Sequence, residues 1–565
     1  MSSRSNTKIR KTSVAARARH RPSASRCLLG ASTIAMSCAL LSATANAHRP
    51  LHAGIPLRQP PPAFRDADPV VSGTWFEMVN AFPGSAPDTA LLMTDGSVMM
   101  HDTCTSNWYR LKPSVTGNYS KGTWIKAASM PGGYAPQYFA SAVLKDGRLI
   151  VNGGEYDAGC NQVFSKLGAL YNPAKNSWTR VSAPSGWNAI GDAASDLLPD
   201  GTFMLAQAVT EQNGHYVGTK AQAIGTISAL PSTTVTWIDA GKGKADNNDE
   251  EGWTRLKNDD VLTVDISIGH NANSPAEIYS HSGHSWSSTG TAANILVDPN
   301  ASEIGPSVRL PSGAIFQAGA KPCGASGCVA HTGIFSAGSW TAGPNFPAIG
   351  GLDYDATDGP AAILPDGNVL VQASPAYSCI DQTTGNPSAY CPPSHFFEFD
   401  GTSLVRVNEP STAPGLASFQ SRMLVLPSGS ILWTSRDAPD VEVYEPQGAS
   451  SKEWHPTIGS LSSTTFTRGH SGYLVQGTLF YGVSNGAAYG DDAQMDSNYP
   501  LVRITNNASG HVCFARVYAR SATAARFAIP GASPPAWENP CDTGASKMVV
   551  VVNGLASSPA SVTVN

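Results

Sequence analysis

Acidic and polar side chains recur at one position of a hairpin motif that repeats along this chain. Nine residues before the glycine of each hairpin turn (Asp260 in the fourth hairpin, which lacks a glycine), the series reads Pro87, Tyr138, Asp192, Glu251, Ile304, Asp358, Gln420 and Arg468. Asp88, Glu250, Glu303 and His470 lie beside this series. Hairpins that surround an axis would bring these side chains together at one mouth of a central channel.

We therefore predict a ligand-binding site at this mouth, formed by Tyr138, Asp192, Glu251, Glu303, Asp358, Gln420, Arg468 and His470. Asp192, Glu251 and Asp358 are the metal candidates, and calcium is the candidate cofactor, because Ca²⁺ and Mg²⁺ prefer oxygen ligands. Close carboxylates can also divide into a general acid and a base, and the same set can hydrogen-bond a sugar. The structural alternative is that these acids cap strand ends and bond loop amides.

Three other polar groups are interpreted as surface features. The acidic run from Asp246 to Glu251 lacks the central glycine and final glutamate of an EF-hand loop. The pair Asp491 and Asp492 follows a glycine, and His281 and His284 lie among serines and glycines rather than on a helix. We expect all three groups to be solvated.

The hairpin that defines the repeat is clearest in residues 139–156, FASAVLKDGRLIVNGGEY. Asp-Gly between two apolar runs is a strong hairpin signal, because the turn needs positive φ angles. Similar turns recur at steps of about 50 to 60 residues, the period of kelch-type propeller blades. The sequence therefore predicts an all-β, kelch-type β-propeller.

The number of blades follows from the strands left over. Seven repeats are complete between the hairpin at Asp95 and the strand at Trp454, which leaves the Trp75 strand and a hairpin at 470–482. A ring closes best when one blade combines strands from both chain ends, so we expect eight blades, with seven as the alternative.

The first 47 residues predict an export signal. They hold eight Lys or Arg and no acid, followed by an apolar run that ends at Ala45-Asn46-Ala47. The run is too short to span a bilayer, so we expect a secreted or periplasmic protein with no membrane span after cleavage. The remaining 29 basic and 42 acidic residues give a formal charge of −13, which argues against a nucleic-acid partner.

Eight cysteines remain after residue 47, an even number that favours disulfides in an oxidising compartment. Spacing suggests pairs but does not prove them. The candidates are Cys104 with Cys160, Cys323 with Cys328, Cys379 with Cys391, and Cys513 with Cys541.

Composition divides the chain into four segments. We expect a signal peptide at 1–47, a proline-rich lead-in at 48–70, the propeller at 71–498 and a C-terminal β-sandwich, Ig-like in kind, at 499–565. The last segment has a plausible size for an independent unit.

A signal peptide, kelch-type hairpins and a C-terminal β-sandwich together resemble the galactose oxidase and glyoxal oxidase family. The resemblance implies a single copper ion with two His and two Tyr ligands, one His lying in a Tyr-His pair that opens the last hairpin. Here that hairpin begins Arg468-Gly469-His470, so Gly469 stands in place of the tyrosine. The only C-terminal His is His511, in an apolar strand. We therefore do not expect copper.

These observations favour a secreted binding protein for an extracellular carbohydrate or protein partner. The alternatives are an enzyme that acts on extracellular sugars or alcohols, either a carboxylate-dependent hydrolase or lyase or a galactose oxidase-like oxidase, and a purely structural module. No complete catalytic set is present to decide among them.

Overall fold

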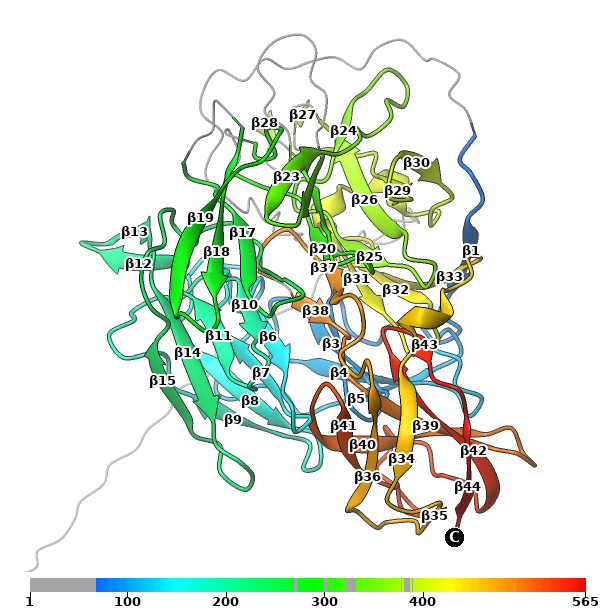
Figure 1. Cartoon of the computed structure of the whole chain (residues 1–565). Helices are drawn as coiled ribbons and strands as arrows, with labels where there is room; N and C mark the ends of the chain where they lie inside the picture. Colours follow the sequence, from blue (N-terminus) through cyan, green and yellow to red (C-terminus); the bar gives the residue numbers. More distant parts are fainter. Residues whose placement is uncertain are drawn as a thin grey trace, which may run out of the picture. The chain divides into compact units, whose positions relative to one another are not determined.

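The computed structural model describes residues 68–268, 273–298, 302–320, 332–376, 379–380, 387–388, 390–492 and 494–565. Regular structure there is almost entirely β-strand, with three short 3-10 helices, η1 (Ala413–Gly415), η2 (Ser418–Gln420) and η3 (Lys452–Trp454). No helix in this part is long and apolar enough to cross a membrane. Most strands form antiparallel sheets arranged like propeller blades (Figure 1), which confirms the predicted all-β propeller class.

The described residues form seven four-stranded blades in which hairpin-connected strands follow one another. Their strands are, for blade 1, β2 (Pro87–Leu92), β3 (Val98–Asp102), β4 (Trp108–Lys112) and β5 (Thr123–Lys126); for blade 2, β6 (Ala140–Val143), β7 (Leu149–Asn152), β8 (Gly168–Asn172) and β9 (Ser177–Val181); for blade 3, β10 (Ser195–Leu197), β11 (Phe203–Ala206), β14 (Gln222–Ile227) and β15 (Val235–Asp239); for blade 4, β16 (Thr254–Arg255), β17 (Val261–Val264), β18 (Pro275–Ser280) and β19 (Ser285–Thr291).

The remaining blades continue this pattern. They are blade 5, β20 (Ser307–Arg309), β21 (Ile315–Ala318), β22 (Thr332–Ser336) and β23 (Ser339–Ala342); blade 6, β25 (Ala361–Ile363), β26 (Val369–Pro375), β29 (His395–Phe399) and β30 (Leu404–Val407); and blade 7, β31 (Ser421–Val425), β32 (Ile431–Ser435), β33 (Asp440–Pro446) and β1 (Gly73–Glu77). Short extra strands are β12 (Val209–Gln212) with β13 (His215–Gly218), β27 (Cys379–Ile380) with β28 (Pro387–Ser388), and β24 (Tyr354–Asp355) on β26.

The hairpin turns have the predicted positive φ at the glycine but not at the aspartate before it, and one turn is shifted in register. Gly147 has a φ of 84°, and its N–H donates to the carbonyl oxygen of Leu144 at 2.9 Å. In the fourth hairpin Asp259, rather than Asp260, has the positive φ, 72°, and its N–H donates to the carbonyl oxygen of Leu256 at 3.1 Å. The repeat position in blade 4 therefore lies one residue earlier than expected.

The ring closes within blade 7 and not through the eighth blade that the sequence predicted. β1 pairs antiparallel with β33, with Trp75 opposite Tyr444, so the N-terminal strand completes blade 7. The half-buried Trp75 ring lies 4.8 Å from the Tyr444 ring and 5.1 Å from the Phe396 ring, measured between centroids. Aromatic packing of the first strand against blades 6 and 7 is thus what joins the chain ends.

Replacement of Trp75 by alanine is expected to lower the free energy of unfolding by about 2–3 kcal/mol, less than the ~3–5 kcal/mol of a fully buried aromatic. Phe76→Ala is the matched control, because Phe76 is 39% exposed on the same strand and should cost under ~1 kcal/mol. Urea denaturation of both variants measures the difference. Equal losses would mean that Trp75 does not close the ring.

A short hairpin enters the middle of the ring. It consists of β37 (Gly486–Ala488) and β38 (Gln494–Asp496), and β37 pairs with β25 of blade 6. The hairpin also packs against the first strands of blades 1, 2, 5 and 7, namely β2, β6, β20 and β31, and Figure 1 shows β37 and β38 in orange beside them. We call residues 486–496 the central hairpin.

Apart from the central hairpin, the strands that follow β33 in the chain form a separate nine-stranded sheet, which packs around its own apolar core. The order is β34 (Thr457–Leu461), β36 (Tyr473–Thr478), β41 (Ala524–Ala528), β40 (Val512–Arg520), β39 (Leu501–Asn506), β42 (Gly544–Val552), β44 (Ala560–Val564) and β35 (Thr465–Phe466), with β43 (Leu555–Ala556) on β42. The hairpin at 470–482, which was expected to complete an eighth blade, therefore belongs to this C-terminal sheet, because β36 pairs with β34 and β41.

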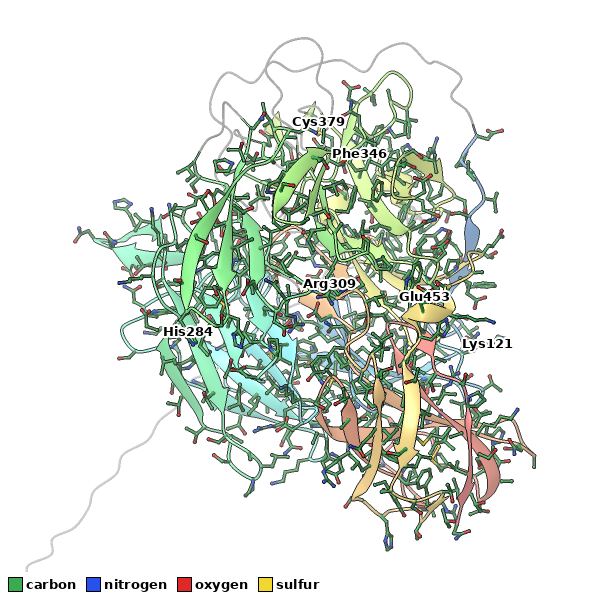
Figure 2. All side chains as sticks on the ribbon, in the orientation of Figure 1. Lys121, His284, Arg309, Phe346, Cys379 and Glu453 are labelled. Carbon is green, nitrogen blue, oxygen red and sulfur yellow. A yellow bond between two sulfur atoms is a disulfide. The ribbon has the colours of Figure 1, made fainter. Side chains whose placement is uncertain are left out.

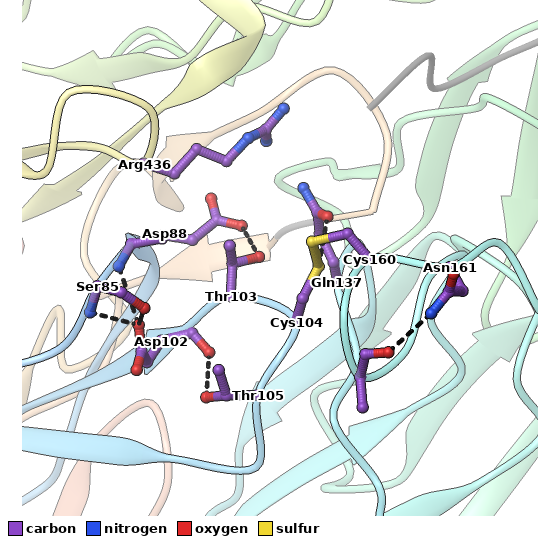
Figure 3. The surroundings of a disulfide bond; sticks show 12 residues. Ser85, Asp88, Asp102, Thr103, Cys104, Thr105, Gln137, Cys160, Asn161 and Arg436 are labelled. Atoms are coloured by element: carbon purple, nitrogen blue, oxygen red, sulfur yellow. Dashed lines mark hydrogen bonds between the residues drawn. A yellow bond between two sulfur atoms is a disulfide. The ribbon is translucent and has the colours of Figure 1, made fainter. Parts of the chain in front are cut away.

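Three of the four predicted disulfides are present, Cys104–Cys160, Cys379–Cys391 and Cys513–Cys541. The first joins blades 1 and 2, since each cysteine follows the second strand of its blade (Figure 3). Cys323 and Cys328 lie outside the described residues. Disulfides of this kind are typical of oxidising, extracytoplasmic compartments.

Candidate functional site

The inner strands begin at residues with unusual backbone angles. Tyr138, Glu250 and Asp358 precede the first strands of blades 2, 4 and 6 and have φ angles of 51°, 62° and 47°. Non-glycine residues rarely adopt positive φ. The common conformation shows that Glu250, and not Glu251, holds the repeat position in blade 4, as the shifted turn at Asp259 requires.

Six buried carboxylates gather where the central hairpin meets these strand ends. Each is at most 7% exposed. We call them the central cluster: Asp192, Glu250, Glu303, Asp358, Asp491 and Asp492. One carboxylate oxygen from each of Asp192, Glu250 and Asp491 lies within 4.8 Å of the other two, a spacing at which a single cation can contact all three.

The tip of the central hairpin fits closely into this place. A Cβ atom at Gly490 would lie 2.6 Å from Oδ1 of Asp358, and one at Gly252 would lie 2.2 Å from the Gly490 carbonyl oxygen. The backbone of the tip thus passes between blades 4 and 6 at a distance that only glycine allows. This contact fixes Asp491 and Asp492 inside the cluster, although the sequence suggested that they were solvated.

Tyr390 joins two members of the cluster. Its hydroxyl donates to Oε1 of Glu303 at 2.7 Å and lies 3.5 Å from Oδ2 of Asp358. The Tyr390 ring packs on Phe419 at 4.6 Å between centroids. Burial and the nearby negative charge of Glu303 raise the Tyr390 pKa well above its usual value, so the hydroxyl keeps its proton and acts as a donor.

Two buried arginines and two tyrosines lie on the blade 7 side. The Arg422 guanidinium lies 3.5 Å from the Tyr489 ring centroid, and its Nε is 3.6 Å from Oδ1 of Asp88. Arg436 lies 5.1 Å from the Tyr138 ring, and Figure 3 shows Arg436 above Asp88, with Asp88 to the left of the Cys104–Cys160 disulfide. Although burial opposes the charge of Arg422, Asp88 and the Tyr489 hydroxyl raise its pKa, so it stays cationic.

The positive charges of Arg422 and Arg436 do not balance the negative charge that the buried carboxylates would carry if all were ionised. The six carboxylates of the cluster and Asp88 give seven potential negative charges. Burial, and after it the charge of neighbouring carboxylates, raises the pKa of Asp192, Glu250, Glu303 and Asp492 well above the usual range. Isolated buried charges are unfavourable unless paired. The cluster must therefore bind either protons or a cation.

Glu251 lies in a second buried group rather than at the mouth. Its Oε1 accepts a hydrogen bond from Lys244 Nζ at 2.7 Å, and Glu277 Oε2 accepts another at 2.6 Å. Asp265 and Asp246 complete this group, in which Asp246 also accepts the backbone N–H of Ile266 and of Ser267, each at 2.7 Å. The acidic run from Asp246 to Glu251 is thus largely buried, contrary to expectation.

The other predicted residues separate into two groups. Tyr138, Asp192, Glu303 and Asp358 lie at the cluster. The Gln420 side chain instead engages Asp437 and accepts the backbone N–H of Ala417 at 2.7 Å. Arg468 and the exposed His470 lie in the loop before β36, in the C-terminal sheet. Within the described residues, the side-chain groups close enough to hold a metal ion contain only carboxylates.

No family model and no curated protein matches this sequence. Among solved structures, the chain is similar to a fungal alcohol oxidase of the AA5 family, solved in complex with copper, at 14% sequence identity and a TM-score of 0.47. That similarity covers 87% of this chain and 100% of the oxidase chain. At this identity and TM-score it assigns no residue of the present chain a role.

Proposed function

We propose that the chain is an extracellular binding protein whose propeller ring holds a hard divalent cation, with calcium as the candidate, in the central cluster. Asp192, Glu250 and Asp491 are the proposed first ligands. The observation that carries the proposal is the convergence of their oxygens within 4.8 Å in a place where two arginines face seven acids.

Asp492 supports this proposal independently. It is fully buried, and the groups that act on it are the carboxyl group of Asp491, with which it shares a hydrogen bond, the cation Arg422 and the carboxylate of Asp88. Two adjacent buried carboxyl groups cannot both ionise without a large cost, because like charges repel and burial removes their hydration. A cation beside Asp491 would offset that cost by direct attraction or through a bound water.

The proposed partner is a hydroxyl-rich or acidic extracellular molecule, such as a carbohydrate. Calcium takes six to eight oxygen ligands, so three protein carboxylates leave positions for hydroxyl or carboxylate oxygens of a ligand. The aromatic side chains Tyr138, Phe419 and Tyr489 and the cation Arg436 lie around the cluster. Each of these side chains is at most 8% exposed, so the open coordination positions of the cation, and not the aromatic faces, would bind the ligand.

Metal content and calcium titration test the proposal. The purified chain is expected to retain calcium, and the chelator-treated chain to bind about one Ca²⁺. Asp491→Asn should weaken calcium binding at least tenfold, because it removes one of three proposed charged ligands. Glu453→Gln, at an exposed position labelled in Figure 2, is the matched control and should bind normally. A tightly bound copper ion, or equal calcium affinity in all three proteins, would contradict the proposal.

A second candidate function is acid–base catalysis on a sugar. It is favoured by the Tyr390 hydroxyl between Glu303 and Asp358 and by the raised pKa of Glu303, which suits a general acid near neutral pH. This candidate predicts cleavage of a glycoside or polyuronide by metal-free protein, with loss of activity in Glu303→Gln. The binding proposal predicts no turnover under those conditions.

A further inference from the structure

A small cavity lies at the other end of the central hairpin, away from the central cluster. Its lining combines residues of blades 2, 3 and 4 with the end of the hairpin and strand β40. Three basic side chains line it, Lys145, Arg255 and Arg520, together with one acid, Asp496. A buried cavity with this charge composition has the character of an anion site.

The two arginines are held in place by backbone carbonyls. Arg520 donates from Nη1 to the Leu144 oxygen at 2.9 Å and from Nη2 to the Val143 oxygen at 2.7 Å. Arg255 donates to the Leu197 oxygen. Both residues are 8% exposed. Their guanidinium groups are therefore positioned before any ligand arrives, which lowers the entropy lost on binding.

The local carboxylates only partly neutralise these cations. Arg255 lies 3.8 Å from Asp196 and 3.6 Å from Asp496, measured between charged atoms, and both distances exceed hydrogen-bond length. A fourth cation, Arg309 (labelled in Figure 2), donates to the Arg255 oxygen at 3.2 Å. Asp259, Asp200 and Asp146 also act electrostatically on these cations, but the cavity lining itself holds three cations and one acid, Asp496.

Burial and neighbouring charges both act on the pKa of these cations. Burial and the neighbouring Arg255 lower the pKa of Arg309 to about 10. Burial likewise lowers the pKa of Lys145 and of Arg520, and the charge of Arg255 contributes in both cases. Asp196, Asp496 and Asp259 raise the pKa of Arg255, so carboxylates offset part of the mutual repulsion of these cations.

We propose that this cavity binds a small inorganic oxyanion, phosphate or sulfate, between Lys145, Arg255 and Arg520. The guanidinium fork matches two oxygens of such an anion, and the lysine supplies a point charge for a third. The free space is about 30 Å³, two to three times the ~10–15 Å³ that one buried water needs. That space suits a single tetrahedral anion and not a sugar phosphate.

The position of the site gives the anion a structural effect. Lys145 belongs to the turn of blade 2, Arg520 ends a strand of the C-terminal sheet, and Asp496 ends the central hairpin. An anion between them would link the C-terminal sheet to the propeller and hold the base of the hairpin whose tip carries Asp491. The inference does not depend on calcium, because the two sites share no residue.

Calorimetric titration of the purified chain with inorganic phosphate and, separately, with sodium sulfate tests the proposal at constant ionic strength. Binding of one anion per chain is expected, and Lys145→Met should weaken it at least tenfold. Lys145→Arg keeps the charge and should bind within about threefold of the natural chain. Lys166→Met removes an exposed lysine elsewhere and should change nothing.

A thermal scan separates specific binding from the general stabilising effect of sulfate. Specific binding predicts a rise of the melting temperature that saturates, and that is absent in Lys145→Met. A rise that is linear in sulfate concentration and equal in all variants would overturn the proposal, as would calorimetry without detectable heat in the natural chain. Binding of sulfate but not phosphate, or the reverse, would identify the anion.

Discussion

Replacement of Lys244 by methionine is expected to lower the free energy of unfolding by about 3–5 kcal/mol, the cost of leaving buried charges without their partner. Among the residues that the structure describes, Lys244 is the one cation paired with Glu251, Asp265 and Glu277, at 2.7, 3.7 and 2.6 Å. Its side chain is 1% exposed. Methionine retains much of the packing against Trp286 but removes the charge.

The loss should depend on pH in a defined direction. Burial raises the Asp265 pKa to about 7 and the Glu251 pKa well above its usual value even with Lys244 present. The Glu277 pKa is lowered, because Lys244 and the hydrogen bonds that Glu277 accepts outweigh burial there. Removal of the lysine would raise the folded-state pKa of all three acids from these positions. Groups whose pKa is higher in the folded than in the unfolded state favour folding at low pH and lose that contribution as pH rises. The deficit of Lys244→Met should therefore be smaller at pH 5 than at pH 8.

Two variants make the Lys244 measurement specific. Lys257→Met changes an exposed lysine of the same blade and should stay within ~0.5 kcal/mol of the natural chain. Adding Glu251→Gln to Lys244→Met should recover part of the loss, because it removes one unpaired charge. Urea denaturation at both pH values provides the data. A Lys244→Met variant as stable as Lys257→Met would show that the lysine does not compensate these acids.

Chelator-treated protein is expected to become less stable as pH rises from about 4 to 8. Burial raises the pKa of Asp192, Glu250, Glu303 and Asp492 above their unfolded values, so the folded state holds more protons than the unfolded state in this range. Stability must then fall with increasing pH. Each pH unit over which one such proton is held adds ~1.4 kcal/mol, so the total loss should reach several kcal/mol.

Calcium should reverse this loss at neutral pH and have little effect near pH 4, where protons compete for the same oxygens. Asp265 and Asp496, whose pKa burial raises to about 7, contribute a pH dependence of the same sign without calcium. The calcium-dependent part therefore identifies the central cluster. Melting curves with chelator or calcium across this range measure both parts. Stability that is constant or rising with pH in chelator would contradict the assignment of protons to the cluster.

The blade pattern could be predicted from sequence because it depends on local signals. Turn residues such as Gly147 need a positive φ, and paired apolar runs flank each turn. The Cys104–Cys160 disulfide followed from matching positions in neighbouring repeats, whereas Cys379–Cys391 and Cys513–Cys541 followed from their spacing along the chain. The site residues Tyr138, Asp192 and Asp358 followed from counting back from those turns. The inner strands themselves range from two to six residues, but each of these three residues lies nine positions before the glycine of its turn.

Where the turn lacked glycine, the count failed by one residue. Asn258-Asp259-Asp260 offers two aspartates, and the sequence does not show which of them takes the positive φ. Because side chains alternate between the two faces of a strand, a slip of one residue exchanges inside for outside. That slip placed Glu251 at the mouth, whereas Glu250 lies there and Glu251 pairs with Lys244.

The central hairpin could not be recognised locally, because residues 486–496 carry neither a regular alternation nor a repeat signal. Their placement depends on contacts with strands far away in the chain, such as the pairing of β37 with β25. Asp491 and Asp492 therefore looked like solvated turn residues. For the same reason the hairpin that precedes it in the chain was assigned to an eighth blade, although β36 pairs with β34 and β41.

Sensitised terbium emission tests the central claim most directly. Tb³⁺ replaces Ca²⁺ at oxygen sites and emits when a nearby aromatic ring transfers its excitation energy, and Tyr390 donates a hydrogen bond to Glu303 of the cluster. Excitation of the chelator-treated chain should give terbium emission that saturates near one ion per chain and that calcium displaces. The Asp491→Asn, Asp492→Asn double variant should lose that emission, whereas Glu453→Gln should keep it. Equal emission from the double variant, or none from the natural chain, would contradict a cation in the central cluster.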